Sequence, residues 1–270
     1  MSVSIVLNWL ASTPDFAVPY ALAALGLIIS ERAGVLSLGA EGLMLVGALA
    51  GIGAQIAIGQ PAVSLVLAML AAGMVSVLFA VMVIWLRVNQ VIAGLALVFF
   101  CQGLTALVGS MAEWTNHATE GIGAMGLWPL SMLPGVGRLF EQNAMVWLTL
   151  PIFCAVAWFF ARTSTGLRLR AVGENPQAAD AAGIRVAAWR FAAVLAGSAL
   201  VGLAGAVLFG CIEALIPQLA AAGVQLPQYF VMMTPYAVTL GVMVWVALSR
   251  RGADEEPGAL GQPYVREERR

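Results

Sequence analysis

The chain has 270 residues, of which 61% are apolar and only 10% are charged. A soluble domain usually carries about 25% charged residues and about half apolar ones, which argues against a soluble enzyme. All 13 basic residues are arginine. Without a lysine, the chain can form neither an ordinary Walker A nucleotide site nor a lysine Schiff base. The net charge of −1 gives no reason to expect a nucleic-acid partner.

Apolar stretches of about 20 residues, the length needed to cross a hydrocarbon core, recur along the chain. Because backbone groups find no water in that core, each stretch predicts a helix. Residues 1–270 are therefore expected to form one all-α domain, a polytopic transmembrane bundle of about seven spans. Pro14, Asp15 and Pro19 interrupt the first stretch. The predicted spans are residues 5–29, 36–58, 63–86, 91–111, 144–161, 191–215 and 229–248.

The arginines orient this bundle. With seven spans, every arginine except Arg138 falls on one side, and the positive-inside rule makes that side cytoplasmic. We therefore expect the N-terminus outside and the C-terminus in the cytoplasm. The same scheme predicts an extracytoplasmic loop over residues 112–143, a cytoplasmic loop over 162–190 and a cytoplasmic tail over 249–270. The outer loop holds His117, the only histidine, and with no second histidine or cysteine beside it we expect no metal site.

Small residues recur every four positions in two of the predicted spans. At that spacing two helices can approach each other closely, so we expect tight packing there. The residues are Gly47 and Gly51 in one span and Ser198, Gly202, Ala206 and Gly210 in the other.

The loop over residues 162–190 carries the strongest local signals. Asn175 is a good N-cap, Pro176 suits the first helical position, and Gly183 can adopt the left-handed conformation that ends a helix. Residues 177–182 between them are mostly strong helix formers. The pattern predicts a helix of about two turns, too short to be stable alone in water. Its alanine surface could fit a groove of a partner protein, and a capped connector fits the same residues equally well.

Residues 166–184 read GLRLRAVGENPQAADAAGI. They resemble the coupling loop of permease subunits of ATP-binding cassette (ABC) importers, in the branch that handles nucleosides, simple sugars and branched-chain amino acids. Residues 25–44, 87–96 and 259–268 carry the same resemblance. Together these segments are most similar to the smaller of two permease subunits in nucleoside or simple-sugar importers. In that comparison this chain lacks one helix pair after Leu208.

The resemblance implies a division of labour. This chain would form the substrate path while a separate ABC ATPase binds ATP, so the chain itself would need no cofactor and would be no enzyme. The other implied partners are a second, larger permease subunit, an extracytoplasmic substrate-binding lipoprotein and the lipid of a bacterial cytoplasmic (inner) membrane. A bulky or charged side chain at Ala178 or Ala179 would impair ATPase docking and leave the bundle intact. The implied coupling residues are Gly173, Glu174, Asn175, Pro176, Ala178, Ala179 and Gly183.

Polar residues within the spans mark a candidate substrate path. Glu41 lies within the second span, Asn89 and Gln90 open the fourth, and Gln102 lies inside it. Charges at membrane depth usually face the bundle interior or a partner. Amides can bond sugar hydroxyls or the edges of a base, and hydrogen bonds between helices explain them equally well. These residues do not separate a nucleoside from a sugar or an amino acid.

Other functions also fit a polytopic bundle. The chain could be an ATP-independent secondary transporter or channel subunit, or, with its helix pair missing, an inactive truncated permease. An intramembrane enzyme is disfavoured, because the sequence lacks a Ser-His-Asp set, an H-E-x-x-H motif and a paired intramembrane aspartate. The need for a partner ATPase separates an ABC permease from a secondary transporter.

Overall fold

The computed structural model describes residues 3–112, 124–126, 141–221 and 257–264. The predicted seventh span, together with Arg138 and His117, lies outside these described residues. Within them the chain is helical apart from short connections, part of the tail and two three-residue strands. Six helices in this part of the chain are long and apolar enough to cross a membrane, and each overlaps one of the first six predicted spans.

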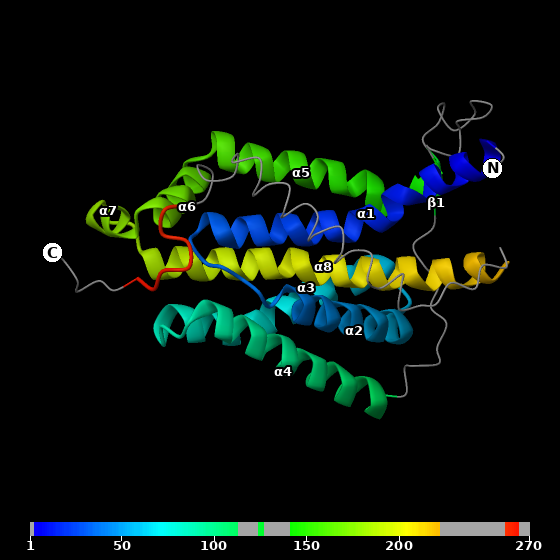
Figure 1. The fold of residues 1–270 in the computed structure, drawn as a ribbon, viewed down its shortest axis with the longest axis horizontal. Coiled ribbons are helices and arrows are strands. Elements are labelled where there is room, and N and C mark those ends of the chain that lie inside the picture. Colours follow the sequence, from blue (N-terminus) through cyan, green and yellow to red (C-terminus); the bar gives the residue numbers. More distant parts are fainter. Residues whose placement is uncertain (1–2, 113–123, 127–140, 222–256, 265–270) are drawn as a thin grey trace, which may run out of the picture.

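The long helices alternate in direction along the bundle (Figure 1). They are α1 (Val3–Arg32), α2 (Ala40–Ile58), α3 (Pro61–Ala80), α4 (Gln90–Met111), α5 (Ala144–Arg162) and α8 (Val186–Ala221). One π-helical turn, η1 (Val81–Trp85), extends α3 before the chain turns into α4. Two short helices, α6 (Ser164–Glu174) and α7 (Pro176–Ala181), join α5 to α8. α8 runs without a break across Leu208, where the missing helix pair was inferred.

α8 is the central helix, with α1 on one side and α2 and α3 on the other (Figure 1). Glycines allow the close approach. A Cβ on Gly47 of α2 would overlap the backbone of Gly202 in α8, and a Cβ on Gly197 of α8 would overlap the Gly26 carbonyl in α1. The predicted tight packing is therefore confirmed at Gly47 and Gly202.

Replacing Gly202 with alanine tests this packing. The new Cβ would lie 2.7 Å from the Ala68 carbonyl oxygen and would overlap the Ala72 side chain, so α3 and α8 would have to separate. We expect a loss of about 1–3 kcal/mol of stability, measured as a lower melting temperature of the purified chain in detergent. The matched control is Gly73→Ala in α3, where a Cβ meets no atom within 4 Å and should be neutral or stabilising. Equal melting temperatures for the two variants would contradict close packing of α3 on α8.

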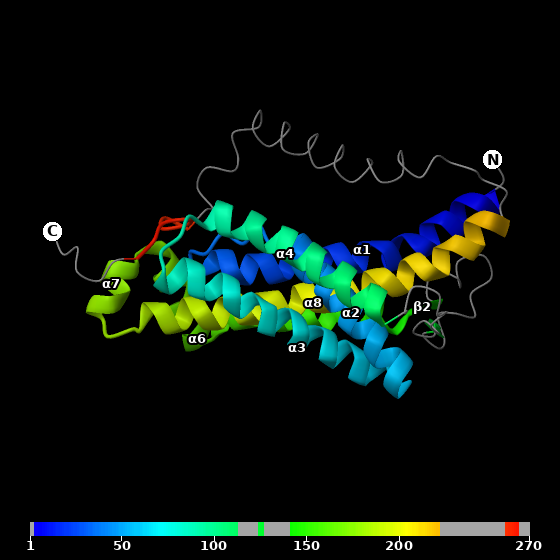
Figure 2. The same cartoon turned by 90° about the horizontal axis from the view of Figure 1, so that it is seen from below.

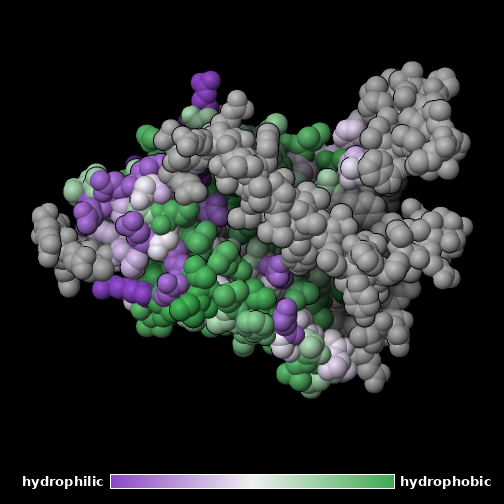
Figure 3. All heavy atoms as spheres, viewed as in Figure 1, coloured by the Kyte–Doolittle hydropathy of each residue, from purple (hydrophilic) through white to green (hydrophobic). Residues whose placement is uncertain are grey.

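α4 and α5 lie at the periphery, and α4 diverges from the bundle towards its C-terminal end (Figures 1 and 2). Large apolar side chains on α4 are exposed, among them Phe99 at 69% and Met111 at 77%. Apolar residues likewise dominate the middle of the described surface (Figure 3). Such a surface suits hydrocarbon and would be unfavourable in water.

Hydrophilic residues, in contrast, gather at the end of the bundle that holds α6 and α7 (Figures 1 and 3). The ends of α1, η1 and α5 and the start of α8 meet there. We call it the Arg-rich end. The prediction that these arginines share one side is confirmed for those in the described residues: Arg32, Arg87, Arg162, Arg168, Arg170, Arg185 and Arg190.

The other end of the bundle shows one departure from the all-α expectation. β1 (Ala124–Gly126) and β2 (Glu141–Asn143) pair antiparallel, with Met125 opposite Gln142. The Asn143 side chain then accepts a hydrogen bond from the Met145 amide at 3.1 Å and caps α5. The Asn143 amide donates to Asp15 of α1 at 3.4 Å. Asp15 therefore connects this strand pair to α1. The helix itself continues through Asp15 and through both of its prolines.

Candidate functional site

The candidate site begins at a sharp turn between α5 and α6. The Thr163 hydroxyl donates to the Phe159 carbonyl at 2.6 Å and accepts from the Gly166 amide at 2.9 Å, so it ends one helix and caps the next. A Cβ on Gly166 would overlap the Phe159 carbonyl. Leu169 and Val172 are buried, three residues apart on one face of α6. The turn thus folds α6 back against the Arg-rich end.

α7 has the local structure that its sequence predicts. The Asn175 side chain accepts a hydrogen bond from the Ala178 amide at 2.9 Å, and Pro176 occupies the first turn. Gly183 has a φ of +83°, the left-handed conformation that ends the helix. The Ile184 amide then donates to the Ala179 carbonyl at 3.0 Å, as in a Schellman motif. The helix covers Pro176–Ala181, one residue shorter than expected.

The two faces of α7 differ. Ala179 is only 4% exposed and lies in a cluster with Val172 of α6 and Val186 of α8. Ile184, Trp189 and Tyr264 cover the edges of this cluster. The opposite face carries Gln177, Ala178, Ala181 and Ala182, all exposed. We call these four residues the bare face of α7.

This geometry corrects one expectation. Ala178 and Ala179 were expected to be equivalent contacts for a partner, but only Ala178 belongs to the bare face. Ala179 points inward because α7 has to bury one face against α6 and α8 to be stable at all. A charge at Ala179 would therefore disturb the protein itself before it met any partner.

Gly173 and Glu174, also expected in the coupling role, bind the tail. The Gly173 carbonyl accepts from the Ala259 amide at 3.0 Å, and Glu174 Oε2 accepts from the Gly258 amide at 3.1 Å. Gly173 also lies so close to the end of α1 that a Cβ would overlap the Arg32 carbonyl. These two residues connect α1, α6 and the tail segment 257–264.

The tail segment makes a third contact, with α8. Arg190 Nη1 donates to the Gln262 carbonyl oxygen at 3.0 Å, and Tyr264 lies against the cluster beneath α7. Ala259 is buried near Gly34, which has a φ of +82°.

The helix α6, the burial of Arg190 and the contacts of the tail were not predicted from the sequence. The Thr163 cap and the spacing of Leu169 and Val172 were the signals that could have revealed α6.

The candidate path residues do not form one cluster. Asn89 caps α4 by accepting from the amides of Val91 and Ile92 at 2.9 and 3.3 Å. Gln90 is buried, and its Oε1 accepts from the Leu36 amide at 2.6 Å, which ties α4 to the segment before α2. Asn89 and Gln90 thus make hydrogen bonds that cap α4 and join it to the connection before α2.

Glu41 and Gln102 behave differently, because both are exposed. Glu41 stands in the first turn of α2, which begins part-way along the bundle (Figure 1). The residues next to them in sequence, Gly42 and Cys101, face each other between α2 and α4. Within the described residues, no group of three His, Cys, Asp or Glu side chains could hold a metal ion.

Comparison with known proteins places this architecture. Residues 10–248 match the model of the family described as branched-chain amino acid transport system / permease component. The chain belongs to this family. It is accordingly a multi-pass protein of the cytoplasmic membrane, in agreement with the six apolar helices of its described residues.

Three relatives illustrate the similarity. The guanosine ABC transporter permease protein of Bacillus subtilis is 32% identical over 73% of this chain and 65% of its own length. The nucleoside ABC transporter permease protein of Lactococcus lactis is 31% identical over 71% and 64%. The glucose ABC transporter permease protein of Haloferax volcanii is 35% identical over 70% and 54%. The chain thus spans less than two thirds of the length of these relatives. No solved structure is a significant match.

Proposed function

We propose that the chain is a membrane-spanning subunit of an ABC importer and that the bare face of α7 docks on a separate ATPase. The supporting observation is the two-sided helix itself. One face packs through Ala179 against α6 and α8, and the other presents three alanines and Gln177 to solvent. It stands at the Arg-rich end, which the positive-inside rule places in the cytoplasm, where ATP is available.

The packing beneath α7 connects the bare face mechanically to the membrane-spanning helices. Ala179 contacts residues of α6 and α8, and its carbonyl accepts a hydrogen bond from Ile184, in the short connection between α7 and α8. α8 in turn is packed on α1, α2 and α3. A displacement of α7 by an ATPase would therefore move the central helix. Closely packed interiors transmit such displacement, because they have little room to absorb it.

The names of the relatives suggest the substrate class, and two exposed polar side chains suggest where the path lies. The relatives are named for guanosine, nucleosides and glucose, which are neutral polyhydroxy compounds. Glu41 and Gln102 are exposed on helices whose exposed side chains are mostly apolar. Polar side chains within the membrane rarely face lipid. We therefore propose that a second, larger permease subunit covers this face of α2 and α4 and that a nucleoside or simple sugar passes between the subunits.

Transport by the reconstituted system tests this proposal. Proteoliposomes would contain the chain, a larger permease subunit and an ABC ATPase from the same organism, with the binding lipoprotein outside. We expect ATP-dependent uptake of guanosine or glucose that disappears when any protein is omitted. Uptake by the chain alone without ATP would favour a secondary transporter. No uptake from the complete system, with the wild-type complex intact, would favour an inactive truncated permease.

The chain alone is expected neither to bind nor to hydrolyse ATP. A Walker A loop needs a lysine that contacts the phosphates, and the sequence has none. The measurement is equilibrium binding of a fluorescent ATP analogue and phosphate release by the stringently purified chain, with the partner ATPase as positive control. Saturable binding that unlabelled ATP displaces would refute this expectation.

A further inference from the structure

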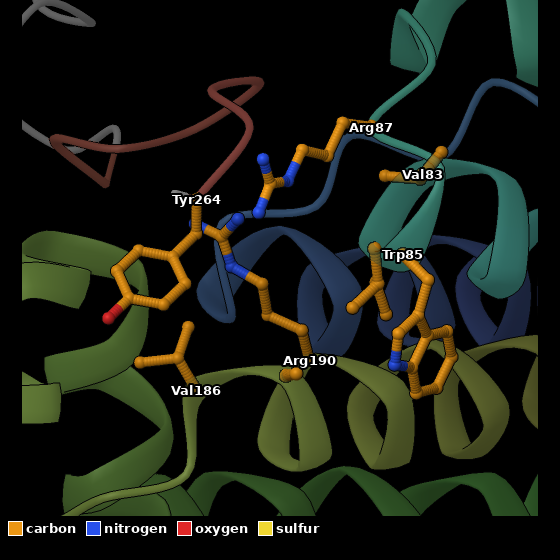
Figure 4. A pocket seen from close by; sticks show the side chains of 8 residues that line it. Val83, Trp85, Arg87, Val186, Arg190 and Tyr264 are labelled. Carbon is orange, nitrogen blue, oxygen red and sulfur yellow. The ribbon is translucent and has the colours of Figure 1, made fainter. Parts of the chain in front are cut away.

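A cavity of about 220 Å³ opens at the Arg-rich end, and no residue of the bare face of α7 lines it (Figure 4). The volume is far above the ~10–15 Å³ that one water molecule requires. Two arginines and one tyrosine supply the polar part of the wall, and no carboxylate lies among the lining residues in the described part of the chain. The lining residues are Val83, Ile84, Trp85, Arg87, Val186, Ala187, Arg190 and Tyr264.

Arg190 is the most informative of these residues. It is only 3% exposed, and one nitrogen, Nη1, donates to the Gln262 carbonyl. Its Nε and Nη2 atoms are buried and have no hydrogen-bond partner among the described residues. Buried charges are normally paired, because an unpaired one loses its hydration without compensation. The guanidinium projects from α8 towards the cavity (Figure 4), so an anion there would supply the missing acceptors.

Arg87 brings a second positive charge to the same cavity. Its φ of +55° makes it the one non-glycine residue with a left-handed backbone in the described residues. Such strain persists only where the surrounding structure enforces it, and it often marks a functional position. The turn is held by hydrogen bonds from the Leu86 amide to Val81 and from the Val88 amide to Met82, at 3.1 and 3.0 Å. In Figure 4 the Arg87 and Arg190 guanidinium groups point towards each other.

The rest of the wall indicates which anion fits. Two guanidinium groups match the oxygens of a phosphate, to which arginine can donate paired hydrogen bonds. Val83, Ile84 and Val186 make the remainder apolar, and Trp85 is about half exposed beside it. Tryptophan is typical of the membrane–water interface, where basic pockets between helices bind lipid headgroups. We propose that this cavity binds the phosphate group of an anionic phospholipid from the cytoplasmic leaflet.

The test measures lipid retention by the full chain. The delipidated protein in detergent is titrated with phosphatidylglycerol or phosphatidylcholine, and binding is followed by native mass spectrometry and by the melting temperature. We expect preferential binding of phosphatidylglycerol, weakened about tenfold or more in Arg87→Gln, since charge-assisted hydrogen bonds to phosphate are lost. Arg87 is exposed at a turn, so this variant should fold. Arg168→Gln, which removes an exposed arginine of α6 outside the cavity, is the matched control and should bind like wild type.

Other outcomes separate the possible occupants. If Arg87→Gln and Arg168→Gln weaken phosphatidylglycerol binding equally, or if neither weakens it, the proposed site is wrong. A melting-temperature rise with inorganic phosphate as large as with phosphatidylglycerol, and likewise dependent on Arg87, would assign the cavity to a free anion and overturn the lipid assignment. Binding of phosphatidylglycerol only after Glu267→Gln and Glu268→Gln would show that the chain's own carboxylates fill the cavity, which also overturns the proposal.

Discussion

Ala178→Glu is expected to remove the ATPase from the complex and to abolish substrate uptake. Ala178 is exposed on the bare face of α7, so the glutamate would be buried against the ATPase without a partner. Because burial of an unpaired carboxylate costs several kcal/mol, the ATPase should bind about 100-fold more weakly or worse. The measurement is co-purification of the ATPase at equal expression of the chain, together with ATP-dependent uptake.

The control for this variant is Ser164→Glu. It adds the same charge at an exposed position of the same cytoplasmic segment, in the first turn of α6, where an acidic side chain is favourable. We expect it to retain both the ATPase and uptake. If Ala178→Glu retains the ATPase as well as Ser164→Glu does, α7 is only a connector.

Ala179→Glu is expected to fail for a different reason, by unfolding the Arg-rich end. Its carboxylate would enter the cluster formed with Val172 and Val186, where no positive partner is among the cluster residues. An uncompensated buried charge costs about 3–5 kcal/mol. We therefore expect a lower melting temperature and proteolytic cleavage near residues 174–185, in the chain alone and without any ATPase present.

Ala179→Ser serves as the control, because it changes the polarity of the site with little change in volume. It should lower the melting temperature much less than Ala179→Glu. A melting temperature of Ala179→Glu equal to that of Ala178→Glu would contradict the orientation of α7 described here. The pair of adjacent alanines thus separates loss of a partner contact from loss of internal packing.

The sequence predicts α7 well because its signals are local. The side-chain cap at Asn175, the proline and the left-handed Gly183 all act within nine residues of chain. The sequence could not show which face of α7 is buried, since its alanines are spread around the helix and no large apolar side chain marks one side. Ala178 and Ala179 are chemically identical, and only the positions of α6 and α8 make one exposed and the other buried.

Residues 164–174 are harder to predict as a helix. Glycine is a poor helix former, and α6 contains two glycines. Both are explained by close contacts with distant backbone: Gly166 with the end of α5 and Gly173 with the end of α1. Tertiary packing here overrides helix propensity, which single-sequence patterns cannot represent.

The contacts of the tail were beyond sequence reasoning for a similar reason. Arg190 and Gln262 are 72 positions apart, and Glu174 and Gly258 are 84 apart. The tail was recognisable as a motif, but no periodicity in it indicates a partner. Arg190 was read as one more charge of the cytoplasmic loop, whereas the structure buries it beside a cavity.

Site-specific photocrosslinking of α7 to the ATPase tests the central claim most directly. Cys101, Cys154 and Cys211 would be replaced by alanine, and a benzophenone maleimide attached to Ala178→Cys in the assembled, transport-active complex. We expect an adduct whose captured peptides come from the Walker A-containing ATPase. Ser110→Cys, exposed at the far end of α4, should give none. An active complex in which Ala178→Cys yields no ATPase adduct, or yields no more than Ser110→Cys, would contradict the assignment of α7 as the coupling surface.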